Sequence, residues 1–135
     1  MSVLRAAVIS GIFSGVPSTA WALAHRGDPL EATWAAGRVL APDAQPGLKL
    51  LGAAAVAHGV LTLGWTAAIA CALPAGSRTR RAVVGAAAGA AIAALDLGGA
   101  HLRRGDPRLA PIARLAIGPQ LADHLAFGAL VGWSL

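Results

Sequence analysis

The chain of 135 residues is too apolar for a soluble domain of its size, because 56% of its residues are hydrophobic and 13% are charged. Its mean hydropathy is +0.64, and so apolar a chain has too little polar surface to cover itself in water. The formal net charge of +5 comes almost entirely from arginines beside the apolar stretches. No basic stripe is interleaved with aromatic residues, which excludes a nucleic-acid partner and favours contact with a lipid bilayer. Cys71 is the only cysteine, so no disulfide can form within one chain.

Four apolar stretches of about membrane-spanning length predict one all-α domain over residues 1–135, an integral membrane bundle of four transmembrane helices. The helices are expected at about residues 6–24, 50–73, 82–100 and 115–135. The excess of arginine over lysine and the high alanine content are typical of a GC-rich bacterial genome. We therefore expect a multi-pass protein of the bacterial inner (plasma) membrane.

The first stretch, about Ala6 to Ala24, is interrupted by Pro17 and is just long enough to span a bilayer, at roughly 28 Å. Arg5 before it and the small residues at its end also resemble a secretory signal peptide. We expect the stretch to be retained as a span, because the third stretch contains a counterpart of it.

A short surface helix is predicted after the first span, from Pro29 to about Leu40. Asp28 is expected to cap this helix and Pro29 to take its first position, while Glu31 completes a capping box. Its apolar side is expected to lie along the membrane surface.

The remaining three spans differ in composition. The second, about Leu50 to Leu73, is ended by a proline and a dense basic turn, which favours both termini on the cytoplasmic side, whereas the total count of Lys and Arg favours the longer loops there. The third, about Ala82 to Ala100, is rich in alanine and glycine, which is typical of a closely packed membrane helix. The fourth, about Leu115 to Leu135, contains Pro119 near its start, which predicts a kink or a delayed helix start.

The two halves of the chain resemble each other. The opening helix of each half has a pair of glycines four residues apart, followed by a histidine and an Arg-Gly-Asp-Pro sequence. Each half then ends in a helix that carries a histidine, His58 or His124. We expect two tandem copies of a two-helix unit, which would be parallel repeats related about the membrane normal.

Ionisable residues inside the predicted spans are the strongest functional signal, because lipid penalises such groups. The polar side chains lie at similar depths, toward the side of the long loops, and are expected to form one buried cluster of His58, Asp96, His124, Asp123, Ser18 and Thr62. Asp123 and His124 point about 100° apart on a regular helix. Only one of these two is therefore expected to face the bundle axis, and we favour His124.

Glycines four residues apart predict helix faces that approach each other closely. Asp96 shares a face with one such pair and His124 with another, so both side chains are expected to point into the bundle. The predicted helix-packing residues are Gly11, Gly15, Gly85, Gly89, Gly128 and Gly132.

Three functions remain open. The one we favour is helix–helix association, as a homo-oligomer or as an accessory subunit of a larger membrane complex, with the polar cluster only fixing helix pairing. The first alternative is a small proton- or ion-coupled transporter or channel, with Asp96 as the acid and the histidines as relays. The second is a metal-dependent intramembrane enzyme that uses two imidazoles and a carboxylate as ligands. No motif identifies a catalytic residue, a cofactor or a metal, and a non-enzymatic role is favoured.

Overall fold

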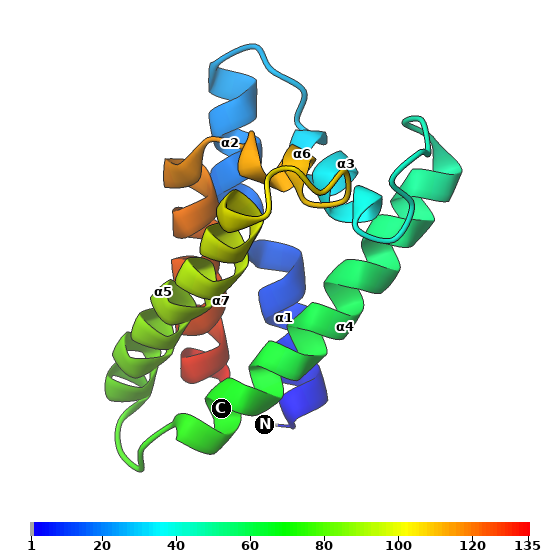
Figure 1. The fold of residues 1–135 in the computed structure, drawn as a ribbon. Helices are drawn as coiled ribbons and strands as arrows, with labels where there is room; N and C mark the ends of the chain where they lie inside the picture. The colour runs from blue at the N-terminus through cyan, green and yellow to red at the C-terminus, as the bar shows by residue number, and fades with distance from the viewer. Residues whose placement is uncertain (1) are drawn as a thin grey trace.

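The structure is a computed structural model that describes residues 2–135, and this part of the chain contains helices and no strands, so the predicted all-α class is confirmed (Figure 1). Long helices alternate in direction, and two short helices lie in the loops between them. The elements are α1 (Val3–Phe13), α2 (Val16–Ala24), α3 (Glu31–Arg38), α4 (Leu48–Ala72), α5 (Arg78–Leu102), α6 (Ala110–Ala113) and α7 (Ile117–Ser134).

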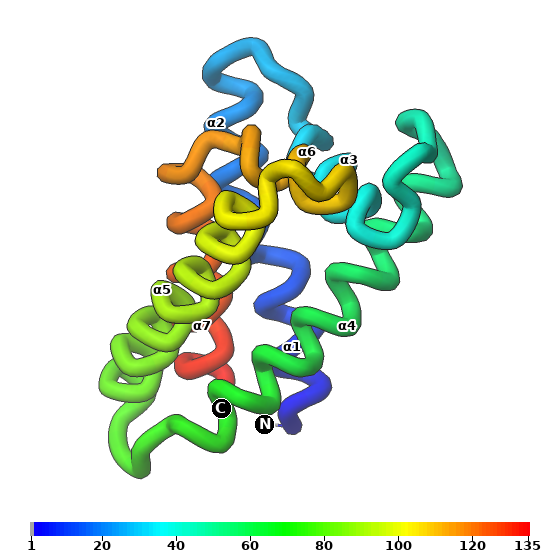
Figure 2. Tube along the Cα trace, viewed as in Figure 1, coloured from blue at the N-terminus to red at the C-terminus, as the bar shows by residue number. Residues whose placement is uncertain are grey.

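Both ends of the chain lie at one end of the bundle, together with the turn between α4 and α5 (Figures 1 and 2). The two longer loops, which contain α3 and α6, lie at the opposite end. The helices α1 and α2 follow each other end to end and together form the first long element (Figure 2). This arrangement places the loop side and the terminus side of the molecule at opposite ends.

Three stretches in the described residues are long and apolar enough to cross a membrane. They are Val3–Ala24, with 22 residues across α1 and α2, and the 25-residue helices α4 and α5. These lengths and compositions indicate a membrane protein. The helix α7 has 18 residues and is not among the three, because Gln120, Asp123 and His124 reduce its hydropathy.

The first long element is broken between α1 and α2, at Ser14 and Gly15. Gly15 is the N-cap of α2, and Pro17 lies in its first turn, where a missing backbone N–H costs least. The sequence located the interruption at Pro17, and the structure places it two residues earlier because proline starts the second helix. The helix α7 begins at Ile117, two residues before Pro119. Pro119 therefore accompanies the delayed helix start and not a kink.

The surface helix begins differently from the prediction. Its N-cap is Leu30, which makes no side-chain cap, so the predicted capping box is wrong. The Asp28 carboxylate instead accepts hydrogen bonds from the Leu30 backbone N–H and from the Trp34 indole, each at 2.8 Å. An aspartate readily accepts from the backbone two residues later, and this turn ends before the helix begins.

The tightest packing in the molecule joins α5 to α7 through four glycines, which we call the glycine seam: Gly85, Gly89, Gly128 and Gly132. A methyl group on Gly85 would overlap the Gly128 carbonyl, and one on Gly128 would overlap the Gly85 carbonyl. The two backbones are therefore in direct contact, as small residues in membrane helices permit. A small apolar core of Ile69, Ile92, Phe127 and Val131 lies beside the seam.

The other predicted glycine pair behaves differently at its two positions. A methyl group on Gly11 would lie 3.2 Å from Cγ2 of Thr62, so α1 approaches α4 closely there. A methyl group on Gly15 would meet no atom within 4 Å, so Gly15 takes part in no close helix contact within the chain, and its packing role stays a prediction. The helix break explains the difference, because Gly15 caps α2 and no longer continues the face of α1.

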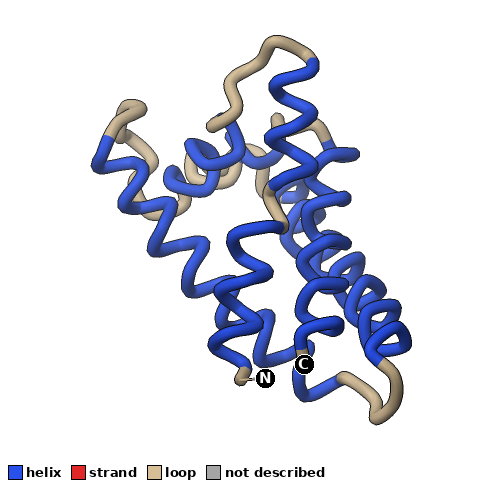
Figure 3. Tube along the Cα trace, turned by 180° about the vertical axis from the view of Figure 1, so that it is seen from behind, coloured by secondary structure: helices blue, strands red, loops and turns tan. Residues whose placement is uncertain are grey.

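The helix α4 leans away from α5 and α7 toward the loop end, as the front and back views both show (Figures 1 and 3). It contacts α1 and, at its loop end, α3, whereas its contact with α5 is slight. The bundle thus consists of a tight α5–α7 pair, with α1 in contact with both α7 and α4, and with α3 packed on α4.

Candidate functional site

Asp96 and His124 form a contact between α5 and α7, in which Nε2 of His124 lies 3.5 Å from Oδ2 of Asp96. The side chains are 33% exposed for Asp96 and 20% exposed for His124. At the other end of the ring, Nδ1 of His124 lies 2.7 Å from the carbonyl oxygen of Gln120, one turn earlier in α7. The glycine seam positions this pair, since Gly89 packs directly against the backbone of His124.

The proton arrangement of this pair follows from its partners. A carbonyl oxygen only accepts hydrogen bonds, so Nδ1 of His124 carries the hydrogen in its contact with Gln120. Nε2 is therefore the atom that gains or loses a proton, and it faces the Asp96 carboxylate. One shared proton leaves the pair neutral overall, whereas adding or removing a proton would create a net charge inside the bundle. The geometry thus directs the titratable nitrogen of His124 toward the carboxylate of Asp96.

Asp123 contacts the opposite neighbour of α7. Its Oδ1 accepts a hydrogen bond of 2.9 Å from the backbone N–H of Ser18, near the start of α2. The Ser18 hydroxyl does not take part in this bond and donates to the Gly15 carbonyl oxygen at 3.2 Å. Ser18 therefore contributes its backbone N–H to the site, and its hydroxyl also lies close enough to interact with the Asp123 carboxylate.

The free N–H of Ser18 is a direct result of the break between α1 and α2. The first N–H groups of a helix have no partner within that helix. The N-cap residue Gly15 has no side chain to accept them. A carboxylate at a helix N-terminus also interacts favourably with the helix dipole. Asp123 thus supplies from α7 the cap that the sequence of α2 lacks.

Asp123 and His124 both face the bundle, which corrects the expectation that only His124 would do so. The helix α7 lies between α2 and α5, and each of the two side chains contacts one of them. The separation of about 100° between adjacent residues directs the pair to two different helices. The sequence could not reveal this, because it depends on which helices flank α7.

The predicted cluster residues make separate contacts, because the His58 side chain contacts α1 and takes no part in the Asp96–His124 contact. The His58 side chain is exposed, and Nε2 lies 3.4 Å from the carbonyl oxygen of Gly11 on α1. Thr62, one turn further along α4, packs against the same glycine. The separate contacts follow from the packing of α4 on α1 and of α7 on α5. His58 remains close enough to Asp123 for their charges to interact.

Buried hydroxyl groups also lie in the terminus-side half of the bundle. The polar side chains were predicted only in the loop-side half. Ser10 and Thr66 are fully buried. The Ser10 hydroxyl donates to the Ala6 carbonyl oxygen at 2.8 Å, whereas the Thr66 hydroxyl has no partner in the described residues. Thr66 lies one turn beyond Thr62 and two turns beyond His58 in the direction of the termini, on the polar face of α4 that helical spacing predicts.

No three His, Cys, Asp or Glu side chains within residues 2–135 are grouped so that they could hold a metal ion. His58 and His124 contact different helices, α1 and α5 respectively. The ligand set that a metal-dependent enzyme would need is therefore not assembled by this part of the chain.

A pocket of about 50 Å³ adjoins the site where α2, the loop after it and the start of α7 meet. Its lining includes Ser18 and Gln120, the two residues whose backbones bind Asp123 and His124. The acidic residues Asp28 and Glu31 also line it. A polar space of this size accommodates water. The pocket therefore joins the polar contacts of α7 to the loop side of the molecule.

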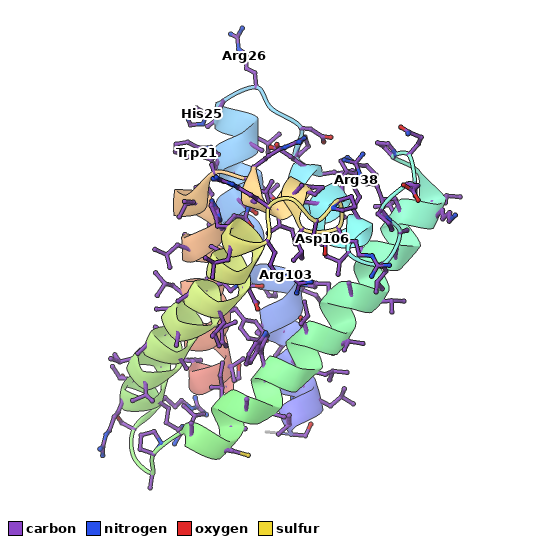
Figure 4. All side chains as sticks on the ribbon, viewed as in Figure 1. Trp21, His25, Arg26, Arg38, Arg103 and Asp106 are labelled. Carbon is purple, nitrogen blue, oxygen red and sulfur yellow. The ribbon has the colours of Figure 1, made fainter. Side chains whose placement is uncertain are left out.

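The loop side carries aromatic and charged side chains on the outside of the bundle. Trp21 and His25 stack with ring centroids 3.8 Å apart at the end of α2. Figure 4 shows Arg26 pointing away from the bundle in the following loop, and Arg103 and Asp106 below α6. A tryptophan and an arginine at a helix end are typical of a membrane–water interface. This side of the molecule therefore resembles a headgroup-facing surface.

The site is defined by the contacts of four helices, α1, α2, α5 and α7, together with His58 and Thr62 of α4. On α7, Asp123 contacts α2 and the next residue, His124, contacts α5. Comparison with protein-family models, curated proteins and solved structures found no match to this chain.

Proposed function

We propose that this chain is a four-span membrane protein that binds and releases a proton at Asp96 and His124. The fourth span would be α7, whose 18 residues extend about 27 Å, close to the thickness of a bilayer core. Its ionisable side chains contact α2 and α5, which reduces the cost of placing them at membrane depth. An even number of spans also agrees with the position of both termini at one end (Figure 1).

Tandem duplication of a two-helix unit is part of this proposal. Three local contacts support it, each found in both halves. Gly11 packs against Thr62, and Gly85 packs against Gly128, each partner lying four residues after a histidine. The helix-ending histidines each place Nδ1 2.9 Å from the carbonyl oxygen four residues earlier. The aspartates of the two Arg-Gly-Asp-Pro sequences, Asp28 and Asp106, each accept from the backbone N–H two residues later.

The observation that carries the proton-binding proposal is the contact between Nε2 of His124 and Oδ2 of Asp96. The fixed hydrogen on Nδ1 leaves one exchangeable proton between a carboxylate and an imidazole, which suits a group that accepts and delivers protons. The second carboxylate, Asp123, lies next in sequence and is held at a helix break. Broken helices at membrane depth are a recurring feature of ion-binding sites in transporters.

Proton movement across vesicles tests the proposal directly. The purified protein is reconstituted into liposomes that contain a pH-sensitive dye, and the external pH is changed. We expect the wild-type protein to accelerate equilibration of the internal pH and Asp96→Asn to abolish the acceleration. Asp43→Asn is the matched control, because Asp43 is an exposed loop acid and the substitution changes the charge equally. Equal rates in protein-containing and protein-free vesicles would refute the function.

The location is proposed to be a cell membrane, with the loop surface at the headgroups. The arginines of the loops and the stacked Trp21 and His25 support this placement. Fractionation of expressing cells tests it. The protein should remain with the membranes after an alkaline carbonate wash and dissolve only in detergent.

Helix–helix association is a second candidate function, supported by an outward face of α4. The glycine seam does not support it, because those four glycines are used between α5 and α7. Gly52, Val56, Gly59 and Leu63 form one face of α4 and are exposed or half-buried, and neither glycine has a neighbouring atom within 4 Å. Small and branched residues on one face suit contact with another membrane helix. If this face binds a second copy, Gly59→Leu should convert an oligomer to a monomer in mild detergent.

A further inference from the structure

We propose that the pocket between α2 and α7 is the water-filled access route to the proton site, and that Glu31 attracts cations at its mouth. The inference rests on the proposed function and adds the side of the membrane from which protons arrive. The pocket is lined by Ser18 and Gln120 at its inner end and by Asp28 and Glu31 at its outer end.

The inner end of the pocket reaches both polar contacts of α7. Ser18 donates its backbone N–H to Asp123, and the Gln120 carbonyl accepts from Nδ1 of His124. Water in the pocket would therefore lie beside the residues that hold the two ionisable side chains. Asp96 lies beyond His124, on the far side of the imidazole. A proton that enters through the pocket thus meets α7 before it meets α5.

The outer end of the pocket has one carboxylate that is free to interact with cations. Both oxygens of Asp28 already accept hydrogen bonds, from the Leu30 backbone and from the Trp34 indole. Glu31 is exposed, and no hydrogen bond or ion pair involves its side chain in the described residues. Asp28 therefore shapes the mouth of the pocket, while Glu31 supplies an available negative charge.

The wall formed by α2 is loosely attached, which suits a route that water enters. No residue of α2 is buried. A second, more open hollow of about 400 Å³, lined by Pro17, Trp21 and the start of α7, lies along the same contact. The ionisable groups that face Asp123 are His124 on its own helix and His58 on α4, and α2 has no ionisable residue. The contact between α2 and α7 is therefore held chiefly by the bond from Ser18 to Asp123.

Thiol labelling tests the access route without relying on proton movement. The exposed Cys71 is first replaced by alanine. A cysteine is then introduced by Ala22→Cys, in the lining of the pocket, or by Leu23→Cys, which is 62% exposed on the outside of the same helix. Membrane-impermeant methanethiosulfonates with a trimethylammonium or a sulfonate group are added to sealed vesicles from the loop side. We expect the Ala22→Cys variant to react faster than the Leu23→Cys variant, and faster with the cationic reagent.

Glu31→Gln tests the role of the carboxylate in the Ala22→Cys background. The cationic labelling rate should fall and the anionic rate should rise, each by about fivefold, the effect of one unit charge at close range in water, so the ratio of the two rates should fall by about 25-fold. Asp43→Asn, which removes an equal charge from the same side outside the pocket, should leave the ratio unchanged. Equal labelling of the Ala22→Cys and Leu23→Cys variants, or a ratio unaffected by Glu31→Gln, would overturn the inference. Selective labelling in a protein that moves no protons would instead refute the proposed function and leave the pocket as a cation-accessible cavity.

Discussion

Oδ1 of Asp123 lies 2.9 Å from the backbone nitrogen of Ser18, so the last long helix caps the second helix of the chain. The bond joins residues 105 positions apart. It satisfies a donor that the break at Gly15 exposes, and it uses a carboxylate that lipid would otherwise penalise. This one contact thus provides a partner both for an unsatisfied N–H at a helix start and for the Asp123 carboxylate.

This relationship predicts different effects for two substitutions of Asp123. Asp123→Ala removes the acceptor, so the free energy of unfolding should fall by about 1–2 kcal/mol, the usual cost of losing a helix N-cap. Asp123→Asn keeps a side-chain oxygen that accepts from Ser18, so it should retain most of the stability. Thermal unfolding in detergent, followed by circular dichroism, measures both. Equal destabilisation by the two variants would show that the charge, and not the cap, is what stabilises the contact.

The glycine seam predicts a strong dependence on residue size at Gly89. Gly89→Ala places a methyl group against the His124 backbone, so it should destabilise the bundle by about 1–3 kcal/mol. Gly64→Ala is the matched control, since Gly64 also lies inside a helix and its methyl group would meet no atom within 4 Å, so this substitution should not destabilise the bundle. Chemical unfolding in mixed micelles gives both values. A neutral Gly89→Ala would contradict the direct backbone contact.

Asp96 should be coupled to His124 and not to His58. A double-mutant cycle with Asp96→Asn and His124→Ala should give a coupling free energy above the roughly 0.6 kcal/mol typical of polar pairs in membrane helices. The same cycle with His58→Ala should give a value near zero, because His58 bonds to α1. Coupling of equal size in both cycles would restore the single cluster that the sequence suggested.

The proposed four-span arrangement predicts that both ends of the chain lie on one side of the membrane. A fluorescent reporter that folds only in the cytoplasm, fused to either end, should give the same signal from both fusions. A reporter inserted in the loop between Ala41 and Gly47 should give the opposite signal. Opposite signals from the two end fusions would remove α7 from the membrane and leave three spans.

The long apolar helices could be predicted from the sequence because their signal is local. The second predicted span, residues 50–73, matches α4 to within two residues at each end, and the third, residues 82–100, lies within α5, which extends further at both ends. The earlier start of α5 comes from Ser77, whose hydroxyl accepts from the Arg80 backbone at 3.2 Å. Such a cap was readable in the sequence, and apolarity alone missed it because the first turn of α5 is basic.

The arrangement of the site was only partly predictable. The spacing along single helices correctly grouped Gly85, Gly89 and Asp96 on α5, since a helical repeat depends on one segment. It could not decide which helix each face would meet, and His58 faces α1 while His124 faces α5. The role of Ser18 was hidden for another reason, because a backbone N–H becomes free only where a helix starts, and that start depends on Gly15.

The chain order of these contacts also has a consequence for biosynthesis. The two groups that bind the ionisable residues of α7, the Ser18 N–H and the Asp96 carboxylate, both precede α7 in the chain. A ribosome therefore delivers them to the bilayer first, and the last helix enters next to partners that are already present. An aspartate at the middle of a lone helix costs about 2.5–3.5 kcal/mol on insertion. Translated first, α7 would have to enter the membrane with both side chains unpaired, so a permuted gene that begins with this helix should insert poorly.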